Sequence, residues 1–363
     1  MPGPRRAPGS EPTESESAAL RLAVDAAERV RGTTSPNPPV GAVILDESGA
    51  VVGVGATSPV GGPHAEVMAL RAAGSRARGG TAVVTLEPCN HQGRTGPCAL
   101  ALIEAGVSRV LFAVDDPHPQ AAGGAQTLRS AGIDVLPGFG AHDVELGPLR
   151  AWLHRQRTGR SHVTWKFAAS LDGRSAAADG TSQWITGPEA RARVHRERAK
   201  LDAIVVGTGT VLADDPWLTA RNPDGSLADH QPVRVVVGER EIPASARVLD
   251  DAAPTLVLRT RDPREVVEAL ADLPDVLLEG GPRLAGAFLE AGLVDRILAF
   301  LSPVLLGAGA AAVEDAGVTN IAQALRFHRE SVETLGPDLL LSLTPGDRGV
   351  RAEDENEQNR TNN

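Results

Sequence analysis

The stretch TAVVTLEPCNHQGRTGPCALALIEA (residues 81–105) decides how the first part of this chain folds. Residues 81–86 are a short apolar run rich in β-branched side chains, which predicts a buried strand. Residues 97–105 predict a helix that begins at Pro97, because proline suits the first turn of a helix. Strands that alternate with helices in this way form a parallel sheet covered by helices on both faces.

The same stretch contains both cysteines of the chain, Cys89 and Cys98, and each follows a proline. Cys89 lies just past the expected strand. Cys98 lies in the first turn of the expected helix, where the helix dipole and free N–H groups favour a thiolate. Upstream, His64 and Glu66 open an alanine-rich helix. Because these positions lie at the ends of a strand and two helices, their side chains can converge.

One imidazole and two thiolates are the three protein ligands of a catalytic zinc site, whose fourth position is left for water. We therefore predict one Zn²⁺ per chain, held by His64, Cys89 and Cys98. Glu66 is surplus as a ligand and is placed to take a proton from water. The zinc deaminases share this pattern, although eight residues separate the cysteines here and two do so there. Two alternatives remain: small core cysteines, or a structural zinc with His91 as fourth ligand.

Composition excludes several classes of protein. Hydrophobic residues at 42%, with 39 Gly and 27 Pro, fit an α/β protein with many loops. A net charge of −10 argues against a nucleic-acid surface but permits a small phosphorylated substrate. Two cysteines allow one disulfide at most, which favours the reducing cytoplasm. We find no signal peptide and no apolar stretch long enough to span a membrane.

Alternating strand and helix patterns occur twice along the chain, so we expect two α/β domains. The first pattern has strands at 39–45, 51–56, 81–86, 109–114 and 133–136, with helices at 17–31, 64–73, 97–105, 121–131 and 143–157. The second has strands at 162–168, 203–207, 233–237, 255–258, 276–279 and 297–301, and a helix up to residue 200. Thr186 and Glu189 have the spacing of a capping box for that helix. The expected division is a disordered start (1–16), a zinc domain (17–145), a helical connector (146–160), a second domain (161–345) and a disordered tail (346–363).

Two glycine-rich turns follow strands in the second half. EGGPRLAG (279–286) leads from a strand into a helix, whose N-terminus favours phosphate, and GTGTVLADDP (207–216) is the other. Neither turn matches the dinucleotide fingerprint or the P-loop. The residues alone leave two readings open, namely a phosphate-bearing ligand and an ordinary turn.

Motifs in both halves resemble those of the bifunctional riboflavin-biosynthesis deaminase/reductase family, over about residues 17–345. In the first half these are SPNPPVG (35–41), PHAE (63–66), TLEPC (85–89) and PC (97–98). In the second half they are ASLDGR (169–174), SQWIT (182–186), TVLADDP (210–216) and EGGP (279–282). The resemblance implies an N-terminal cytidine-deaminase-like three-layer sandwich and a C-terminal dihydrofolate-reductase-like domain.

The resemblance also implies two reactions on one phosphoribosylated pyrimidine. A zinc-dependent step removes an amine from 2,5-diamino-6-(5-phosphoribosylamino)pyrimidin-4(3H)-one, and an NADPH-dependent step reduces the ribosyl group to ribityl. A paralogue that acts on a related pyrimidine in a secondary pathway would have the same motifs. We expect a homo-oligomer with no nucleic-acid or membrane partner.

The resemblance assigns roles to individual residues. In the first domain it implies that His64, Cys89 and Cys98 bind zinc, that Glu66 transfers protons and that Asn37 orients the substrate. The implied cofactor contacts are Ala168, Trp184, Thr210, Asp214, Gly281, Pro282, Arg283, Leu284, Ala285, Gly286 and Ala287. The implied substrate contacts are Ser182, Arg198, Leu218, Arg221 and Glu279. Arg198 and Arg221 suit a phosphate clamp, because guanidinium groups pair with phosphate oxygens.

Overall fold

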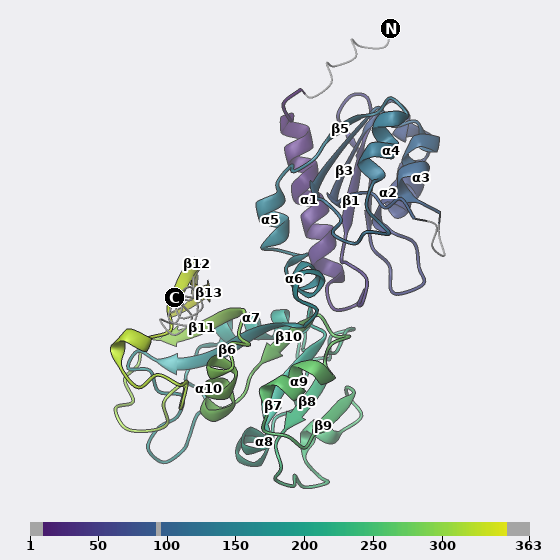
Figure 1. The fold of residues 1–363 in the computed structure, drawn as a ribbon. Helices are drawn as coiled ribbons and strands as arrows, with labels where there is room; N and C mark the ends of the chain where they lie inside the picture. The colour runs from purple at the N-terminus through teal and green to yellow at the C-terminus, as the bar shows by residue number, and fades with distance from the viewer. Residues whose placement is uncertain (1–9, 92–95, 347–363) are drawn as a thin grey trace, which may run out of the picture. The chain divides into compact units, whose positions relative to one another are not determined.

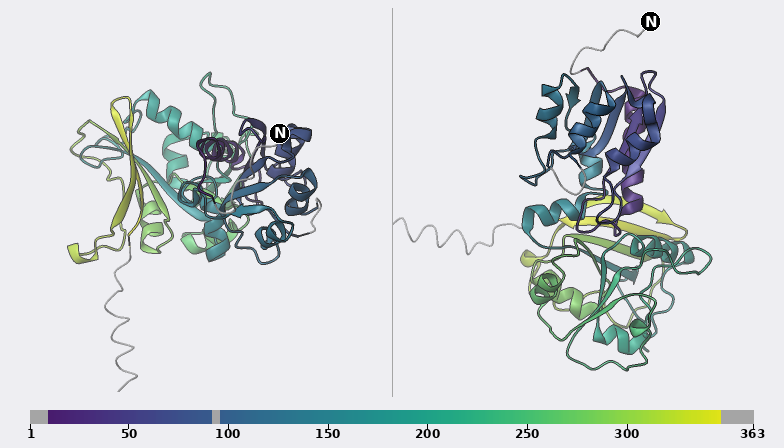
Figure 2. Two further views of the ribbon diagram at one scale, coloured as in Figure 1. Left: turned by 90° about the horizontal axis from the view of Figure 1, so that it is seen from above. Right: turned by 90° about the vertical axis from the view of Figure 1, so that its right-hand side faces the viewer.

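A computed structural model describes residues 10–91 and 96–346 of the chain. It divides into two compact units, and the predicted two-domain α/β fold is confirmed (Figures 1 and 2). The first unit runs to Ser161 and includes Leu270–Pro274, and the second comprises His162–Ala269 and the chain from Asp275 onward. No helix among the described residues is long and apolar enough to cross a bilayer.

The first unit is built on a five-stranded sheet with the order β2-β1-β3-β4-β5. β1 pairs with β2 and β3 in antiparallel fashion, whereas β3, β4 and β5 are parallel. The central strands are buried along their whole length, as their continuous apolar runs predict. The strands are β1 (Gly41–Leu45), β2 (Val51–Ala56), β3 (Thr81–Leu86), β4 (Arg109–Val114) and β5 (Asp134–Leu136).

Helices cover both faces of this sheet and give a three-layer sandwich (Figure 1). One face carries α1 (Glu14–Val30) and α5 (Ala141–Glu145), and the other carries α2 (Ala65–Ala73), α3 (Cys98–Ala105) and α4 (Gly124–Ser130). A short 3₁₀ turn, η1 (Gly74–Ala77), follows α2. α6 (Arg150–Thr158) lies in the expected connector but belongs to the first unit, because Trp152 and Leu153 are buried in its core.

The expected disorder at the start of the chain is wrong for residues 10–16. Thr13 and Glu16 form a capping box, in which the Thr13 hydroxyl accepts from the Glu16 N–H at 3.0 Å and the Thr13 N–H donates to Glu16 at 2.7 Å. Glu16 also pairs with buried Arg109 on β4 at 3.2 Å, which ties the helix start to the sheet. Gly346, expected in the tail, bonds to the Arg326 carbonyl. The other expected disordered residues, 1–9 and 347–363, lie outside the described part of the chain.

Close packing of α2 against β2 depends on two glycines. A Cβ atom at Gly53 would lie 2.1 Å from the Ala69 carbonyl oxygen, and one at Gly55 would lie 2.3 Å from the Ala65 oxygen. No larger residue fits without moving the helix, since such contacts are far below van der Waals distance. This contact sets the position of the N-terminus of α2, which carries His64 and Glu66.

The second unit is built on an eight-stranded sheet with the order β12-β13-β11-β6-β10-β7-β8-β9. Six neighbouring strands, from β11 to β9, are parallel, and β13 and β12 add an antiparallel edge. The strands are β6 (His162–Ser170), β7 (Ala203–Gly207), β8 (Val233–Val237), β9 (Thr255–Leu258), β10 (Asp275–Leu278), β11 (Arg296–Ser302), β12 (Phe327–Leu335) and β13 (Asp338–Pro345). The helices are α7 (Pro188–Arg198), α8 (Thr208–Asp214), α9 (Pro263–Ala269) and α10 (Pro282–Glu290), with 3₁₀ turns η2 (Arg247–Leu249) and η3 (Ile321–Gln323).

The structure corrects three expectations in this unit. The capping box at Thr186 and Glu189 is wrong, because Gly187 is the N-cap of α7 and no side chain caps the helix. The Gly187 N–H donates instead to Asp338 at 2.7 Å, a partner distant in sequence. The glycine-rich turn after β7 is the helix α8, and the β12–β13 hairpin was not expected.

Candidate functional sites

Three side chains of the first unit converge as the sequence predicts. His64 is the N-cap of α2, Cys89 follows β3, and Cys98 begins α3. His64 Nδ1 lies 3.5 Å from Cys89 Sγ and 3.3 Å from Cys98 Sγ, and the ligand atoms all lie within 4.8 Å of one another. With Zn–S near 2.3 Å and Zn–N near 2.0–2.1 Å, a tetrahedral zinc places its nitrogen and sulfur ligands about 3.5 Å apart. The donor types and spacing therefore fit Zn²⁺.

The cluster offers three protein ligand atoms. Among residues 10–91 and 96–346, His64, Cys89 and Cys98 are the one group with metal-ligand spacing. His91 lines the adjacent cavity but is not part of that group. Three protein ligands are typical of a catalytic zinc site, whereas structural sites normally have four. The arrangement does not favour a structural zinc closed by His91.

Glu66 is the buried carboxyl group beside the cluster. It is 4% exposed and faces the same cavity as His64. Burial, together with the negative charge of Cys89, raises the pKa of Glu66 to about 7. A carboxyl group with a pKa near neutrality can both accept and donate a proton, as general acid–base catalysis requires.

The two thiols differ in acidity, in the direction opposite to our expectation. The pKa of Cys89 is lowered to about 4, chiefly because the Cys98 thiol donates a hydrogen bond to it. The pKa of Cys98 is raised, since it is the donor and is buried. The backbone N–H at the start of α3 stabilises the thiolate of Cys89 and not that of Cys98. This N–H belongs to Cys98, and its nitrogen lies 3.4 Å from Cys89 Sγ.

The cavity over the cluster is small, about 270 Å³. Asn37 lines it, as does Asp116, whose pKa is raised because it is partly buried. Glu87 supports the wall by accepting backbone N–H groups, among them that of Ala125 at 2.9 Å. Sequence reasoning missed several other wall residues, since they come from loops and from α6; these are Thr57, His118, Ala121, Trp152 and Gln156.

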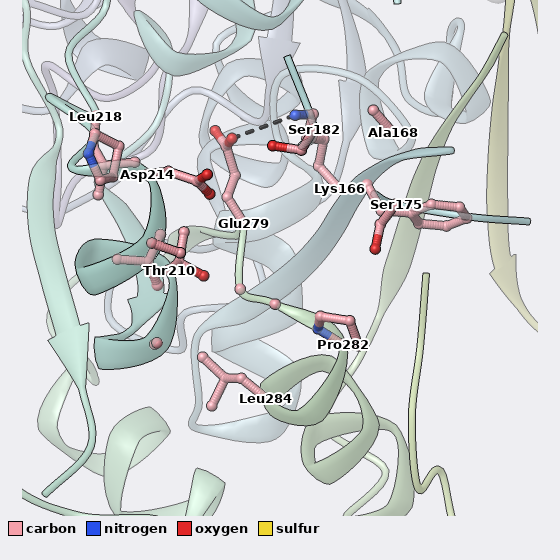
Figure 3. Close-up of a pocket in the computed structure, with 18 of the residues that line it drawn as sticks. Lys166, Ala168, Ser175, Ser182, Thr210, Asp214, Leu218, Glu279, Pro282 and Leu284 are labelled. Atoms are coloured by element: carbon pink, nitrogen blue, oxygen red, sulfur yellow. Dashed lines mark hydrogen bonds and ion pairs between the residues drawn. The ribbon is translucent and has the colours of Figure 1, made fainter. Parts of the chain in front are cut away.

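The second unit contains a much larger cavity, of about 1480 Å³ (Figure 3). It lies where several parallel strands end and α8 and α10 begin, which is the usual ligand site of an open α/β sheet. A single small-molecule site is about 300–1,000 Å³, so this cavity has room for two ligands. Most of the expected contacts line it, namely Ala168, Ser182, Trp184, Arg198, Thr210, Asp214, Leu218, Arg221, Glu279, Gly281, Pro282, Arg283, Leu284 and Ala287.

Two residues of the 281–287 turn do not reach the cavity. Ala285 is fully buried in α10. Gly286 packs against the backbone of Glu314, because a Cβ there would lie 1.6 Å from the Glu314 carbonyl oxygen. Both are packing positions, so the structure does not place them as cofactor contacts.

A buried charge network crosses the cavity floor. Glu279 accepts from Arg198 through two bonds, of 2.7 and 2.8 Å, and from Lys166 at 3.4 Å; Figure 3 shows its carboxylate directed toward Lys166. Burial opposes ionisation of Glu279, but the two cations outweigh it and lower the pKa to about 2. The fork of Arg198, expected to bind phosphate, is thus paired with Glu279.

Two models of known families match the chain. The cytidine and deoxycytidylate deaminase zinc-binding region matches residues 13–114, and the RibD C-terminal domain matches residues 161–341. The first match contains all three members of the metal cluster, and the second contains the large cavity.

Relatives match over nearly the whole chain. The riboflavin biosynthesis protein RibD of Mycobacterium tuberculosis is 61% identical, over 90% of this chain and 96% of its own. RibD of Escherichia coli is 41% identical, over 89% and 98%. The solved structure of Acinetobacter baumannii RibD is 37% identical with a TM-score of 0.80, over 92% and 99%. A Thermotoga maritima structure described as a diaminohydroxyphosphoribosylaminopyrimidine deaminase/5-amino-6-(5-phosphoribosylamino)uracil reductase is 30% identical with a TM-score of 0.83, over the same shares.

Proposed function

This chain belongs to the RibD family of bifunctional riboflavin-biosynthesis enzymes, and from that we propose which residues carry its deaminase and reductase steps. The substrate of the first step is 2,5-diamino-6-(5-phosphoribosylamino)pyrimidin-4(3H)-one. Water replaces an exocyclic amine, which leaves as ammonia, and the product is 5-amino-6-(5-phosphoribosylamino)uracil. The second step adds a hydride to C1′ of the ribosyl group and a proton to the ring oxygen, whose bond to C1′ breaks, so that an open-chain ribityl group remains bonded to the amine.

We assign the deaminase step to the small cavity. His64, Cys89 and Cys98 would hold Zn²⁺, whose Lewis acidity makes water a better nucleophile near neutral pH. Glu66 would move the protons, first from water to the ring nitrogen and then to the departing amine. The observation that supports this most is the buried Glu66 carboxyl beside a cluster of three possible zinc ligands. Asn37, on the same cavity wall, would orient the pyrimidine.

We assign the reductase step to the large cavity, with NADPH as the hydride donor. The N-terminus of α10 follows Gly280 and Gly281, and a Cβ on Gly280 would come within 2.8 Å of Leu284. Free N–H groups at such a turn suit the cofactor pyrophosphate. The proposed cofactor contacts are Ala168, Trp184, Thr210, Asp214, Gly281, Pro282, Arg283, Leu284 and Ala287.

The proposed substrate contacts of this step surround the charge network. Glu279 and Lys166 would bind ribose hydroxyls, and Arg198 would hold the Glu279 carboxylate in place through its two hydrogen bonds. Ser182, Leu218 and Arg221 would complete the site.

One experiment tests both assignments. The purified protein is incubated with the diaminopyrimidine phosphate, with and without NADPH, and ammonia and NADPH oxidation are followed separately. We expect ammonia release without NADPH, and NADPH oxidation that begins only as the deaminated product accumulates. NADPH oxidation without prior ammonia release would contradict the proposed order.

We further propose a homo-oligomer that works in the reducing cytoplasm. The two cysteines are free thiols that zinc requires as thiolates, which favours a reducing compartment. Large apolar side chains of the second unit, Leu171, Leu305 and Ile321, are 69%, 73% and 85% exposed. Exposed apolar groups of this size favour contact with another surface. Light scattering at several protein concentrations would give the mass of the assembly.

A further inference from the structure

Two arginine side chains, those of Arg221 and Arg247, contact the ring of Trp217 in the large cavity. Trp217 follows α8 and is 43% exposed, and its neighbour Leu218 is labelled in Figure 3 among the residues that line that cavity. The guanidinium carbon of Arg247 lies 4.1 Å from the centroid of the Trp217 ring, and that of Arg221 lies 5.4 Å from it. Cation–π contacts of this kind hold the guanidinium groups in defined positions. All three residues line the cavity.

The backbone beneath this arrangement is held by a buried charge. Arg234 on β8 is 0% exposed, and its Nη1 lies 3.4 Å from the carbonyl oxygens of both Trp217 and Arg247. The same nitrogen donates to Asp250 at 2.7 Å, which balances its charge. The Arg247 N–H donates to Asp215 at 2.8 Å, and the Arg247 Nε lies 3.4 Å from the same carboxylate. Arg247 is therefore a positioned side chain on an anchored loop.

The charges around Trp217 do not cancel. Arg247 pairs with the carboxylate of Asp215, whereas Arg221 donates to the Gly225 carbonyl oxygen at 2.9 Å, which carries no net charge. Arg198 contributes less free charge, since Glu279 occupies its fork. The guanidinium groups beside Trp217 would therefore attract an anionic group of the ligand, and the Glu279 carboxylate would repel it.

We propose that Arg247, together with Arg221 on the Trp217 ring, binds the phosphate of the phosphoribosyl substrate. This inference rests on the proposed reductase function. Both guanidinium groups contact the same ring and line the same cavity, where they present positive charge to a bound ligand. Guanidinium forks pair with phosphate oxygens through charge-assisted, directional hydrogen bonds. Arg247 is then a specificity residue that distinguishes phosphorylated from unphosphorylated ribosyl groups.

The test compares two substrates in the full-length protein, the deaminated phosphoribosyl compound and its dephosphorylated counterpart. We expect Arg247→Ala to raise KM for the phosphorylated substrate roughly tenfold, as for loss of one charge-assisted bond at a half-exposed site. The kcat, the Kd for NADPH and the KM for the dephosphorylated compound should not change. Arg247→Lys should raise the KM for the phosphorylated substrate by a smaller factor, because lysine keeps the positive charge. The control is Arg264→Ala, an exposed arginine of α9 outside the cavity, which should match the wild type.

An equal KM increase for both substrates, or weaker NADPH binding in Arg247→Ala, would overturn the proposal. Calorimetric titration with ribose 5-phosphate and with ribose provides a readout that does not depend on turnover. Weaker binding of ribose 5-phosphate alone in Arg247→Ala supports the phosphate contact, and unchanged binding overturns it. If the wild type oxidises no NADPH with either substrate, the reductase function fails, and this titration still decides the role of Arg247.

Discussion

At the scale of single residues, the buried carboxyl of Glu66 is the most specific chemical feature of the first unit. We expect Glu66→Gln to lower ammonia release by about 10²–10⁴-fold, because glutamine cannot transfer a proton. Zinc content should stay near one per chain, since Glu66 is not a member of the cluster. Ammonia assays and metal analysis of the same sample measure both. Glu104→Gln, at an exposed position of α3, is the matched control; near-normal deamination by Glu66→Gln would remove Glu66 from the mechanism.

A second residue makes stability depend on pH. The pKa of Glu279 is lowered to about 2 in the folded protein, so its ion pairs contribute stability that is present above its unfolded pKa, near 4.3. That contribution is lost as the pH falls from about 4.3 toward 2, and it amounts to at most about 3 kcal/mol. We expect the free energy of unfolding of Glu279→Gln to fall furthest below that of the wild type at pH 6, with the gap narrowing below pH 4. Urea unfolding across this range measures it, with exposed Glu268→Gln as the control; a gap that does not vary with pH would contradict the assigned pKa.

At the scale of elements, the contact between α2 and β2 determines where His64 and Glu66 lie. We expect Gly53→Ala to destabilise the first unit by roughly 1–3 kcal/mol, because the added Cβ would overlap the Ala69 carbonyl. The helix start should shift with it and weaken zinc binding. Thermal unfolding and competition with a chelator measure the two effects. Val54→Ala, on the same strand with a 43% exposed side chain, should cost far less; equal losses in both variants would mean that the close approach is not the cause.

At the scale of the whole molecule, the two activities should be separable. The metal cluster lies in the first unit and the large cavity in the second. We expect Cys89→Ser, or removal of zinc by a chelator, to abolish ammonia release and to leave NADPH-dependent reduction of the deaminated substrate intact. Separate assays of the two steps decide this. Loss of both activities in a variant that remains folded would show that the units depend on each other.

Local patterns in the sequence were sufficient for most elements and for the metal cluster. The strands at 81–86, 233–237 and 255–258 were predicted with the observed limits, because apolar runs between turn residues need no distant partner to be recognised. The sequence predicted that the metal ligands converge, because each lies at the end of a strand or at the start of a helix that packs on the same sheet. These ligands are His64, Cys89 and Cys98. The family resemblance added the two reactions and the cofactor, since the glycine-rich turns by themselves left open both a phosphate-bearing ligand and an ordinary turn.

Tertiary structure alone decided which charged groups pair. Arg198 was expected to bind phosphate, but the fold places Glu279, far along the chain, in its fork. Gly187 rather than Thr186 caps α7, because Asp338 of the C-terminal hairpin reaches its N–H. Arg247 contacts the Trp217 ring because buried Arg234 donates hydrogen bonds to the backbone carbonyl groups of both residues. Hydrophobic periodicity reports the burial of each segment by itself, whereas the pairing of charges depends on which distant side chains the packed sheet brings within hydrogen-bonding distance.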